Sequence, residues 1–400
     1  MNLKRPLILI LLFVFIDVLG FSLILPLLPF YAAEFDASSV VVGVLISSNA
    51  ITKIIGAPLL GRLSDRFGRK PLLVTSITGT LISFLILGWA GALWMLFLGR
   101  ALDGLLGGNA SLAQAYITDS TEKEQRTNAL GLIGAAFGLG FIFGPALGGM
   151  LSAGGNYALP SFAAAGLAAV NLVGVLLWLP ESLPPEARAK SLRETEGDFS
   201  LQALVKALQR PCVGPLLTVV LAYGLAFTMF ETMFSLFAQK KLGLTAQTTS
   251  FVLAYVGVLI VLMQGLGIRF LTDRFRDKEL IFAGAGILTV GLVGWGLSPS
   301  LPWLLASMVP LSLASGMLRV SLDSALTKSV YQDEVGGLLG LSTSLNSFTR
   351  VVSPLLGSLL LAELAPAAPG LAGALLMIGV VYFTWERILH VPDIDCEPVD

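Results

Sequence analysis

Long apolar runs alternate with short polar segments along the whole 400-residue chain. Each run is about 20 residues or longer, which is the length an α-helix needs to cross the hydrocarbon core of a bilayer. Charges and turn residues separate the runs, and the longest polar stretch is residues 180–210. The pattern therefore predicts an all-α polytopic membrane protein with twelve transmembrane helices. Their expected ranges are 6–31, 40–61, 71–91, 93–116, 128–151, 159–179, 212–238, 249–270, 279–297, 302–326, 336–361 and 367–388.

The composition and the placement of charge agree with this topology. Only 13% of the residues are charged, and the mean hydropathy is +0.83. Most of the 25 Lys and Arg lie near the N-terminus, in alternate loops or in the tail, and only Lys240 and Lys241 lie in the opposite loops. The positive-inside rule then places both termini in the cytoplasm, as an even number of helices requires.

A weak internal repeat divides the chain. Leu63–Lys70 (LSDRFGRK) aligns with Leu271–Lys278 (LTDRFRDK) at a spacing of about 208 residues, and Trp94 and Pro145 have partners in Trp303 and Pro354 at nearly the same spacing. Parallel repeats with a midplane site between them are a recurring transporter design. The predicted organisation is a six-helix half at 1–180, a cytoplasmic linker at 181–210 ending in an amphipathic helix, a second half at 211–390 and a cytoplasmic tail at 391–400.

The stretch GRLSDRFGRKP (Gly61–Pro71) carries five charges between two apolar runs. Gly61 would allow a close approach at the end of a helix, and Gly68 would supply a turn conformation that is costly for other residues. An ionised Asp65 only accepts hydrogen bonds, so it suits a helix start or an arginine partner. A solvated loop would explain the basic residues but not this order, which favours a conformational gate.

A second motif, GLGFIFGPALGG (Gly138–Gly149), spaces three glycines four residues apart around Pro145. Small residues at this spacing permit close contact between membrane helices, and proline frees a backbone carbonyl. We expect Gly144 and Pro145 to help seal the two halves rather than to contact substrate.

These stretches resemble the major facilitator superfamily. GRLSDRFGRKP matches its loop motif between helices 2 and 3, LGR (Leu98–Arg100) its helix 4 motif, and GLGFIFGPALGG the helix 5 motif of its twelve-helix drug:proton antiporters. The whole chain is most similar to bacterial tetracycline-efflux proteins. The resemblance implies that Asp65 docks on the far half and that Arg69 pairs with an acid such as Asp119. It gives the candidate gating residues as Gly61, Asp65, Arg66, Gly68, Arg69, Asp119, Gly144 and Pro145.

The chain departs from the tetracycline exporters at several positions. Where they carry an acid, a histidine and an acid on helices 3, 8 and 9, this chain has Ser83, Ile260 and Leu288, and Asp103 replaces the usual glutamine of the helix 4 motif. The resemblance therefore implies the antiporter scaffold, whereas tetracycline as the substrate does not follow from it.

Charged residues inside the predicted spans are the sharpest local signals, since each costs roughly 2.5–3.5 kcal/mol on insertion scales. A carboxylate there can release its proton when its surroundings change, so Asp17, Glu231 and Asp103 are the candidate proton carriers. A balanced structural charge network is the alternative, and Arg319 and Asp323 are spaced to neutralise each other. The candidate cavity residues are Asn49, Lys53, Arg100, Asn109, Gln114, Phe227, Gln264, Asn346 and Arg350.

The predicted function is secondary active transport in the cytoplasmic (inner) membrane of a bacterium. A lipophilic, drug-like or small organic compound would be exported in exchange for protons by alternating access. One alternative is a proton-coupled symporter or a uniporter of a small polar or anionic metabolite, favoured by the four intramembrane bases; another is a receptor or scaffold without transport. No nucleophile–base pair, metal spacing or nucleotide loop stands out, so we expect no enzyme, cofactor or metal site. The expected partners are a small molecule, protons and the bilayer, with no nucleic acid, and the protein is expected to be a monomer.

Overall fold

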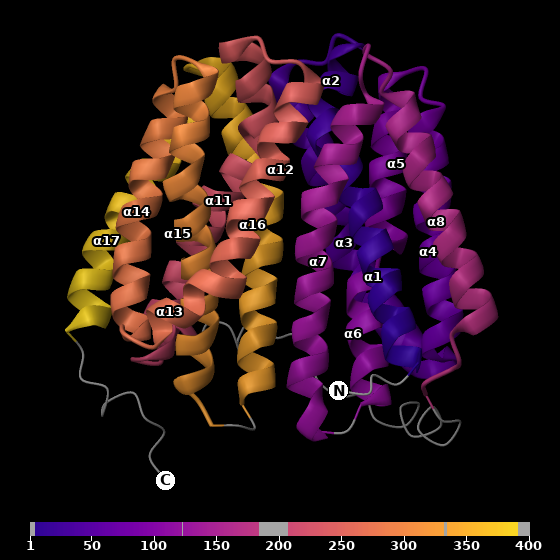
Figure 1. Cartoon of the computed structure of the whole chain (residues 1–400), viewed down its shortest axis with the longest axis horizontal. Helices are drawn as coiled ribbons and strands as arrows, with labels where there is room; N and C mark the ends of the chain where they lie inside the picture. Colours follow the sequence, from indigo (N-terminus) through magenta and orange to yellow (C-terminus); the bar gives the residue numbers. More distant parts are fainter. Residues whose placement is uncertain (1–4, 122, 184–206, 332–333, 391–400) are drawn as a thin grey trace. The chain divides into compact units, whose positions relative to one another are not determined.

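The computed structural model describes residues 5–121, 123–183, 207–331 and 334–390, and all regular structure in these ranges is helical (Figure 1). The chain folds into two compact units, and residues Leu244–Tyr255 group with the first of them. The helices before the linker are α1 (Arg5–Ile24), α2 (Leu28–Ala33), α3 (Ser39–Phe67), α4 (Arg69–Gly88), α5 (Leu93–Leu106), α6 (Asn109–Ser120), α7 (Lys123–Leu151) and α8 (Ala158–Trp178), with the 3-10 turn η1 (Leu25–Leu27) joining α1 to α2.

The helices after the linker complete the described chain. They are α11 (Val213–Leu242), α12 (Ala246–Leu262), α13 (Ile268–Thr272), α14 (Asp277–Leu297), α15 (Leu301–Lys328), α16 (Val335–Glu363) and α17 (Ala368–Thr384), with π-helical segments η2 (Met263–Gly267) and η3 (Trp385–Leu389). The predicted amphipathic helix of the linker falls mostly, and the tail at 391–400 entirely, outside the described residues.

The all-α membrane architecture is confirmed, with one correction. In the described part of the chain, 11 helical segments are long and apolar enough to cross a membrane. The predicted continuous span 93–116 is instead broken into α5 (14 residues) and α6 (12 residues). Gly107 and Gly108 form the break, and a Cβ on Gly107 would lie 2.1 Å from the Asp103 carbonyl oxygen. The two short helices together are the remaining span of a twelve-helix fold.

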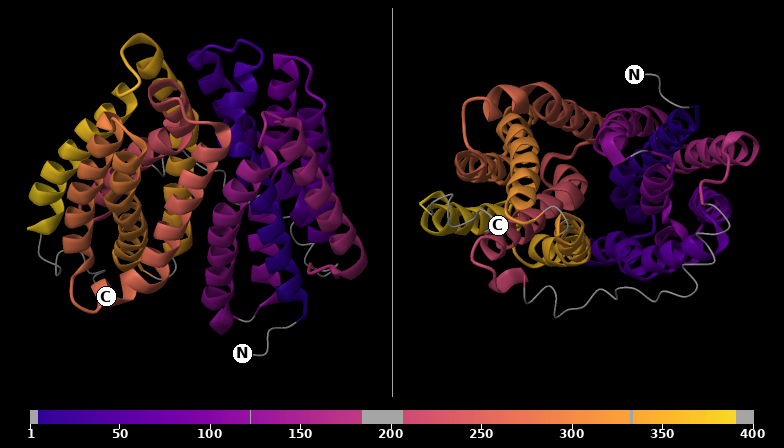
Figure 2. Two further views of the ribbon diagram at one scale, coloured as in Figure 1. Left: turned by 45° about the horizontal axis from the view of Figure 1, so that its top comes forward. Right: turned by 90° about the horizontal axis from the view of Figure 1, so that it is seen from below.

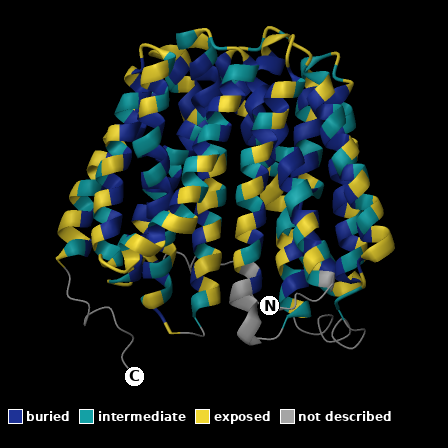
Figure 3. Ribbon diagram, viewed as in Figure 1, coloured by how far each residue is buried: buried dark blue, intermediate teal, exposed yellow. Residues whose placement is uncertain are grey.

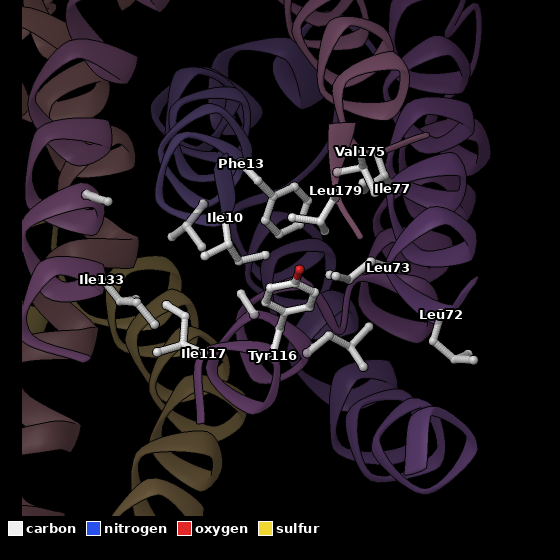
Figure 4. Packing of buried hydrophobic residues seen from close by; sticks show 14 of the residues in the cluster. Ile10, Phe13, Leu72, Leu73, Ile77, Tyr116, Ile117, Ile133, Val175 and Leu179 are labelled. Carbon is white, nitrogen blue, oxygen red and sulfur yellow. The ribbon is translucent and has the colours of Figure 1, made fainter. Parts of the chain in front are cut away.

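Within the first unit, α1 packs against α7 and α8, while α4 packs against α5 and α8. Aliphatic and aromatic side chains of α1, α4, α6 and α8 meet in a core around Tyr116 (Figure 4). Phe13 and Leu73 are fully buried beside it, and the Tyr116 hydroxyl donates to the Pro180 carbonyl oxygen at 2.9 Å. This hydrogen bond ties the end of the sixth span to α6.

In the second unit, α14 packs against α15 and α17, and α11 against α16 and α17 (Figure 2). The largest fully buried side chain is Trp295 of α14, whose ring meets Phe230 edge-on at 5.1 Å between centroids. Exposed residues recur along the helices of both units (Figure 3). Many of them are large and apolar, including Leu177, Val290 and Leu375 at 65–71% exposure. Apolar surface this extensive suits contact with lipid rather than water.

Candidate transport site and gate

A polar cluster lies among the apolar helices of the first unit, around Asp17 of α1. The side-chain amide of Asn109 donates to the Asp17 carboxylate and, at 3.2 Å, to the Thr80 hydroxyl of α4. Asn109 is the first residue of α6, so the glycine break before it places this amide against α1 and α4. Asp17 is half-buried, whereas Asn109 and Thr80 are buried.

A second set of polar groups joins α3 to α5. The Asn49 amide donates to the Asp103 carboxylate at 2.9 Å and to the Arg100 carbonyl oxygen at 3.1 Å. Arg100 Nη1 lies 3.7 Å from the same Asp103 carboxylate, so this ion pair is long. Close approach makes the arrangement possible, because a Cβ on Gly104 would lie 2.2 Å from the Asn49 carbonyl oxygen.

Electrostatics connects the two sets. Asp103 and Lys53 are the ionisable neighbours whose charges act on the Asp17 carboxylate. The Arg100 guanidinium is 2% exposed and lies 5.4 Å from the centroid of the Phe21 ring. Arg100 Nε and Asn109 Oδ1 are buried and have no hydrogen-bond partner among the described residues. The cluster thus combines a carboxylate, a buried cation and free hydrogen-bonding capacity.

This combination fits coupled transport. The proton affinity of a carboxylate depends on hydration and on neighbouring charges, and both change when a cavity opens or a cation moves. The predicted proton carrier Asp17 contacts the predicted cavity residue Asn109, and the predicted residues Asn49, Arg100 and Asp103 contact one another. Lys53 is exposed on α3 and acts on Asp17 through its charge. Gln114, five residues after Asn109 on α6, is exposed.

In the second unit the predicted residues gather around Tyr223 of α11. The Phe227 ring stacks on Tyr223 with centroids 5.8 Å apart, and the charge of Glu231 acts on the Tyr223 hydroxyl together with those of Arg319 and Asp323. Of the other predicted cavity residues of this unit, Gln264 is half-buried in η2, and Asn346 and Arg350 are exposed on α16. Asn346 lies against α11 next to Tyr223, because a Cβ on Gly224 would lie 3.4 Å from the Asn346 Oδ1.

The predicted gate is organised around Arg69, the first residue of α4. Its Nε lies 2.8 Å from Asp119 at the end of α6, so the ion pair that the resemblance implied is present. Its Nη1 lies 2.5 Å from Asp65 and 2.6 Å from the Ser64 hydroxyl. Gly68 between the two helices has a φ of +108°, a backbone conformation that favours glycine. The tight turn at Gly68 therefore places the Arg69 side chain against the last turn of α3.

Two details correct the prediction for this stretch. The helix α3 continues to Phe67 instead of ending at residue 61, so Asp65 lies in its last turn. A Cβ on Gly61 would meet nothing within 4 Å, so the close approach expected at Gly61 is wrong. Arg66 is exposed and lies 5.4 Å from the centroid of the Phe67 ring.

The glycine ridge of α7 packs against α1 inside the first unit. A Cβ on Gly140 would lie 2.7 Å from Val18, and one on Gly148 would lie 2.2 Å from the Leu23 carbonyl oxygen. Gly144 faces Ser22, whose hydroxyl donates to the Gly140 carbonyl oxygen at 2.8 Å. Pro145 is buried within α7. The predicted role of Gly144 and Pro145 in sealing the two halves stays a prediction.

Sequence reasoning missed three residues of these sites. Glu181 accepts from the backbone N–H groups of Arg69 (2.9 Å) and Lys70 (3.2 Å), which caps the first turn of α4. Its signal was an acid directly after a span, in the stretch PES. Thr80 and Tyr223 gave no signal, since a single hydroxyl in an apolar run is ordinary in membrane helices.

A bundle of membrane helices with charged side chains in its interior is typical of a polytopic membrane transporter of a small molecule. The family model of the Major Facilitator Superfamily matches residues 10–354, and the chain belongs to this superfamily.

Curated relatives sharpen this placement. The chain is 32% identical to the class C tetracycline resistance protein of Escherichia coli over 93% of each chain. It is 30% identical to the class B protein of the same organism, over 85% of this chain and 84% of that one. It is also 29% identical to solute carrier family 22 member 18 of Mus musculus over 91% of each. The expected similarity to the tetracycline resistance proteins is thus confirmed.

Solved structures share the fold. The nucleoside transporter NupG superposes with a TM-score of 0.76 at 16% identity, over 96% of this chain and all (100%) of that one. The human organic anion transporter MFSD10 gives a TM-score of 0.68 at 20% identity, over 95% and 99%. Identities this low concern the fold alone.

Proposed function

We propose that the protein exports a lipophilic, drug-like compound in exchange for protons, by alternating access between the two halves. The observation that carries this proposal is the Asp17–Asn109 hydrogen bond at the centre of the first unit's polar cluster. A carboxylate in the middle of an apolar span is a functional site by default. Asp17 would take up and release the proton, with Glu231 and Asp103 as further candidates.

The neighbours of Asp17 suit this role. Asn109 can follow Asp17 through a protonation change, because its amide donates to a carboxylate and its Oδ1, which has no partner among the described residues, can accept from a carboxylic acid. Lys53 and Asp103 act on Asp17 with opposite charge. A substrate that displaced either charge would change the proton affinity of Asp17, which is the coupling that exchange requires.

The similarity to tetracycline resistance proteins supports export of an aromatic, drug-like compound. The similarity does not extend to Ser83, Ile260 and Leu288, which stand where the resemblance implies an acid, a histidine and an acid. Ser83 is buried and donates to the Gly99 carbonyl oxygen at 2.9 Å, and Leu288 is fully buried. Both are packing positions here, so proton handling would have to lie elsewhere, and Asp17 is the proposed place.

The test is substrate-driven proton flux in liposomes that hold the purified full-length protein, with tetracycline and ethidium as probes. Asp17→Asn is expected to abolish coupled flux, because the amide cannot carry a proton. Asp36→Asn is the matched control, since Asp36 is exposed outside the spans and asparagine tolerates its positive φ of 53°. Full coupled flux in both Asp17→Asn and Glu231→Gln would refute the assignment.

Uptake of a small polar or anionic metabolite is the second candidate. Arg100 favours it, because this guanidinium is 2% exposed and its Nε has no partner among the described residues. Such a buried donor suits a carboxylate or phosphate. Accumulation assays in cells separate the two functions: export lowers the cellular content of the transported compound on expression, whereas uptake raises it.

A further inference from the structure

Three exposed side chains form a row at the end of α13 in the second unit. The row consists of Leu266 in η2, Phe270 in α13 and Arg274 just after α13, each four residues from the next. Leu266 and Phe270 are 72% and 55% exposed. The Arg274 guanidinium lies 3.8 Å from the centroid of the Phe270 ring, so it stays on the same side of the segment. This exposed row therefore changes from aliphatic to aromatic to cationic as the helix reaches its end.

The other side of the same segment is packed against protein. Met263 and Ile268 are buried in one cluster with Leu280 of α14 and Met317 of α15. A Cβ on Gly316 of α15 would lie 3.2 Å from the Met263 side chain. The exposed row thus lies on the side that the packing against α14 and α15 leaves uncovered.

The cationic end of the exposed row is not neutralised by a described acid. Arg274 and Arg269 are both exposed, and neither guanidinium forms an ion pair with another described side chain. Asp277 at the start of α14 pairs instead with Lys328. Residues 269–279 together with Lys328 hold five cationic and three acidic side chains, so this surface is positive.

The order of side chains in the row matches the order of groups in an anionic phospholipid. The span ends at Thr272, so Leu266 lies about 9 Å inside it at a rise of 1.5 Å per residue, at the depth of the acyl chains. Aromatic side chains such as Phe270 suit the boundary between the acyl chains and the headgroups. Beyond that boundary, a guanidinium matches phosphate oxygens with its paired N–H donors, and stacking on a ring leaves that edge of Arg274 free.

The first copy of the repeat lacks this row. At the position of Phe270 it has Arg62, and Arg66, the counterpart of Arg274, lies 5.4 Å from the ring of its neighbour Phe67. The positive-inside rule explains why both copies are basic. It does not explain why the second copy places an aliphatic, an aromatic and a cationic side chain in this order.

We propose that the end of α13 is a binding site for an anionic phospholipid of the leaflet in which this span ends. Arg274 and Arg269 would bind the phosphate group, while Leu266 and Phe270 would contact the acyl chain. The positive-inside rule predicts that this is the cytoplasmic leaflet. The inference goes beyond the proposed function, and it does not depend on which compound is transported.

Lipid binding to the purified, delipidated full-length protein in detergent, followed by native mass spectrometry, tests the site. The probes are phosphatidylglycerol and phosphatidylcholine with the same acyl chains, and inorganic phosphate as a competitor. The wild type is expected to bind phosphatidylglycerol more tightly than phosphatidylcholine. Arg274→Ala should weaken phosphatidylglycerol about fivefold, the factor expected for one basic side chain near a membrane surface. The double variant Arg269→Ala/Arg274→Ala should weaken it more than about tenfold, and phosphatidylcholine should bind both variants as it binds the wild type.

Arg66→Ala is the matched control, because it removes the exposed counterpart of Arg274 in the first copy of the repeat, and it should retain the wild-type affinity. If the double variant proves unstable, Arg274→Gln keeps a polar side chain of similar length and should show the same fivefold loss. Equal binding of the two lipids to the wild type, unchanged affinity in the arginine variants, or an equal loss in Arg66→Ala would overturn the site. Displacement of phosphatidylglycerol by millimolar inorganic phosphate would assign the arginines to a free anion and overturn the lipid.

Discussion

The two copies of the repeated stretch build the same junction with opposite polarity. In the first unit, Arg69 at the start of α4 pairs with Asp119 at the end of α6. In the second, Asp277 at the start of α14 pairs with Lys328 at the end of α15, at 2.7 Å. The paired positions are about 208 residues apart in sequence, so the repeat conserves the ion pair while exchanging its charges. The position of the pair in the fold matters more than which partner carries which sign.

The two junctions differ in how completely the pair is enclosed. Arg69 also contacts Asp65 and Ser64, and its side chain is 11% exposed. Lys328 is 70% exposed, and Asp277 also accepts from the Ser324 hydroxyl at 2.9 Å. Removing one partner of an enclosed ion pair leaves a charge without compensation and costs several kcal/mol, whereas removing one partner of an exposed pair costs about 0–1 kcal/mol. The first junction is therefore the more sensitive to substitution.

The largest expected effect comes from reversing the first junction. Arg69→Asp leaves Asp65 and Asp119 close to another acid, and we expect a loss of about 3 kcal/mol or more in the free energy of unfolding. Adding Asp119→Lys copies the polarity of the second junction and should recover at least about 1 kcal/mol of that loss. Unfolding in detergent, followed by tryptophan fluorescence, measures both.

The control for this pair of variants is Arg66→Ala, which removes an exposed cation of the same motif and should leave stability nearly unchanged. If the double variant loses as much stability as the two single losses added together, the charges of the junction do not interact, and the comparison between the two junctions is mistaken.

A much smaller effect is expected at the second junction. Lys328→Ala should change the free energy of unfolding by no more than about 1 kcal/mol, because the lysine is mostly exposed and its ion pair is screened by water. The same unfolding assay, run beside the Arg69 variants, gives the ratio of the two effects. A loss at Lys328 as large as that at Arg69 would contradict the assignment of unequal strength.

The smallest effect is expected at an ion pair of the second unit whose two side chains are 50% and 36% exposed. Arg210 donates to Glu334 at 2.7 and 3.0 Å and lowers the pKa of that carboxyl below its ordinary value. The stabilisation is therefore present above the ordinary pKa of a glutamate, about 4.3, and is lost as the pH falls through the lower folded-state pKa. The free energies of unfolding of the wild type and of Glu334→Gln should differ slightly near pH 7, and this difference should disappear as the pH is lowered.

High salt should reduce the difference in free energy of unfolding between the wild type and Glu334→Gln at pH 7, since salt screens exposed charges. A difference between wild type and Glu334→Gln that grows on acidification would have the wrong sign and would exclude the ion pair as its cause.

The sequence predicted the architecture well because length and hydropathy alone decide what can cross a bilayer. It could not predict the break between α5 and α6. Two consecutive glycines are common in membrane helices, and only the packing around Gly107 and Gly108 shows that the chain turns there. The consequence reaches the site, because the break positions Asn109 against Asp17.

The candidate site was predicted only in part, for a related reason. A charged residue inside a span is conspicuous in the sequence because its insertion into the membrane is unfavourable, so Asp17, Arg100 and Asp103 could be predicted. Hydroxyls and an acid at a span's end carry no such cost. Thr80, Tyr223 and Glu181 acquire their roles from neighbours that are distant in the chain.

The sequence by itself determined that this chain spans a membrane, how many times it crosses, and that it belongs to the transporters of the major facilitator superfamily. The first two properties follow from composition and periodicity, and the third from the resemblance of local motifs to those of that superfamily. The tertiary structure alone decided that Asn109 donates to Asp17 and that Glu181 caps α4. Contacts of this kind depend on which helix faces meet. Hydropathy does not determine those faces when all the helices are similarly apolar, so they are set by side-chain packing.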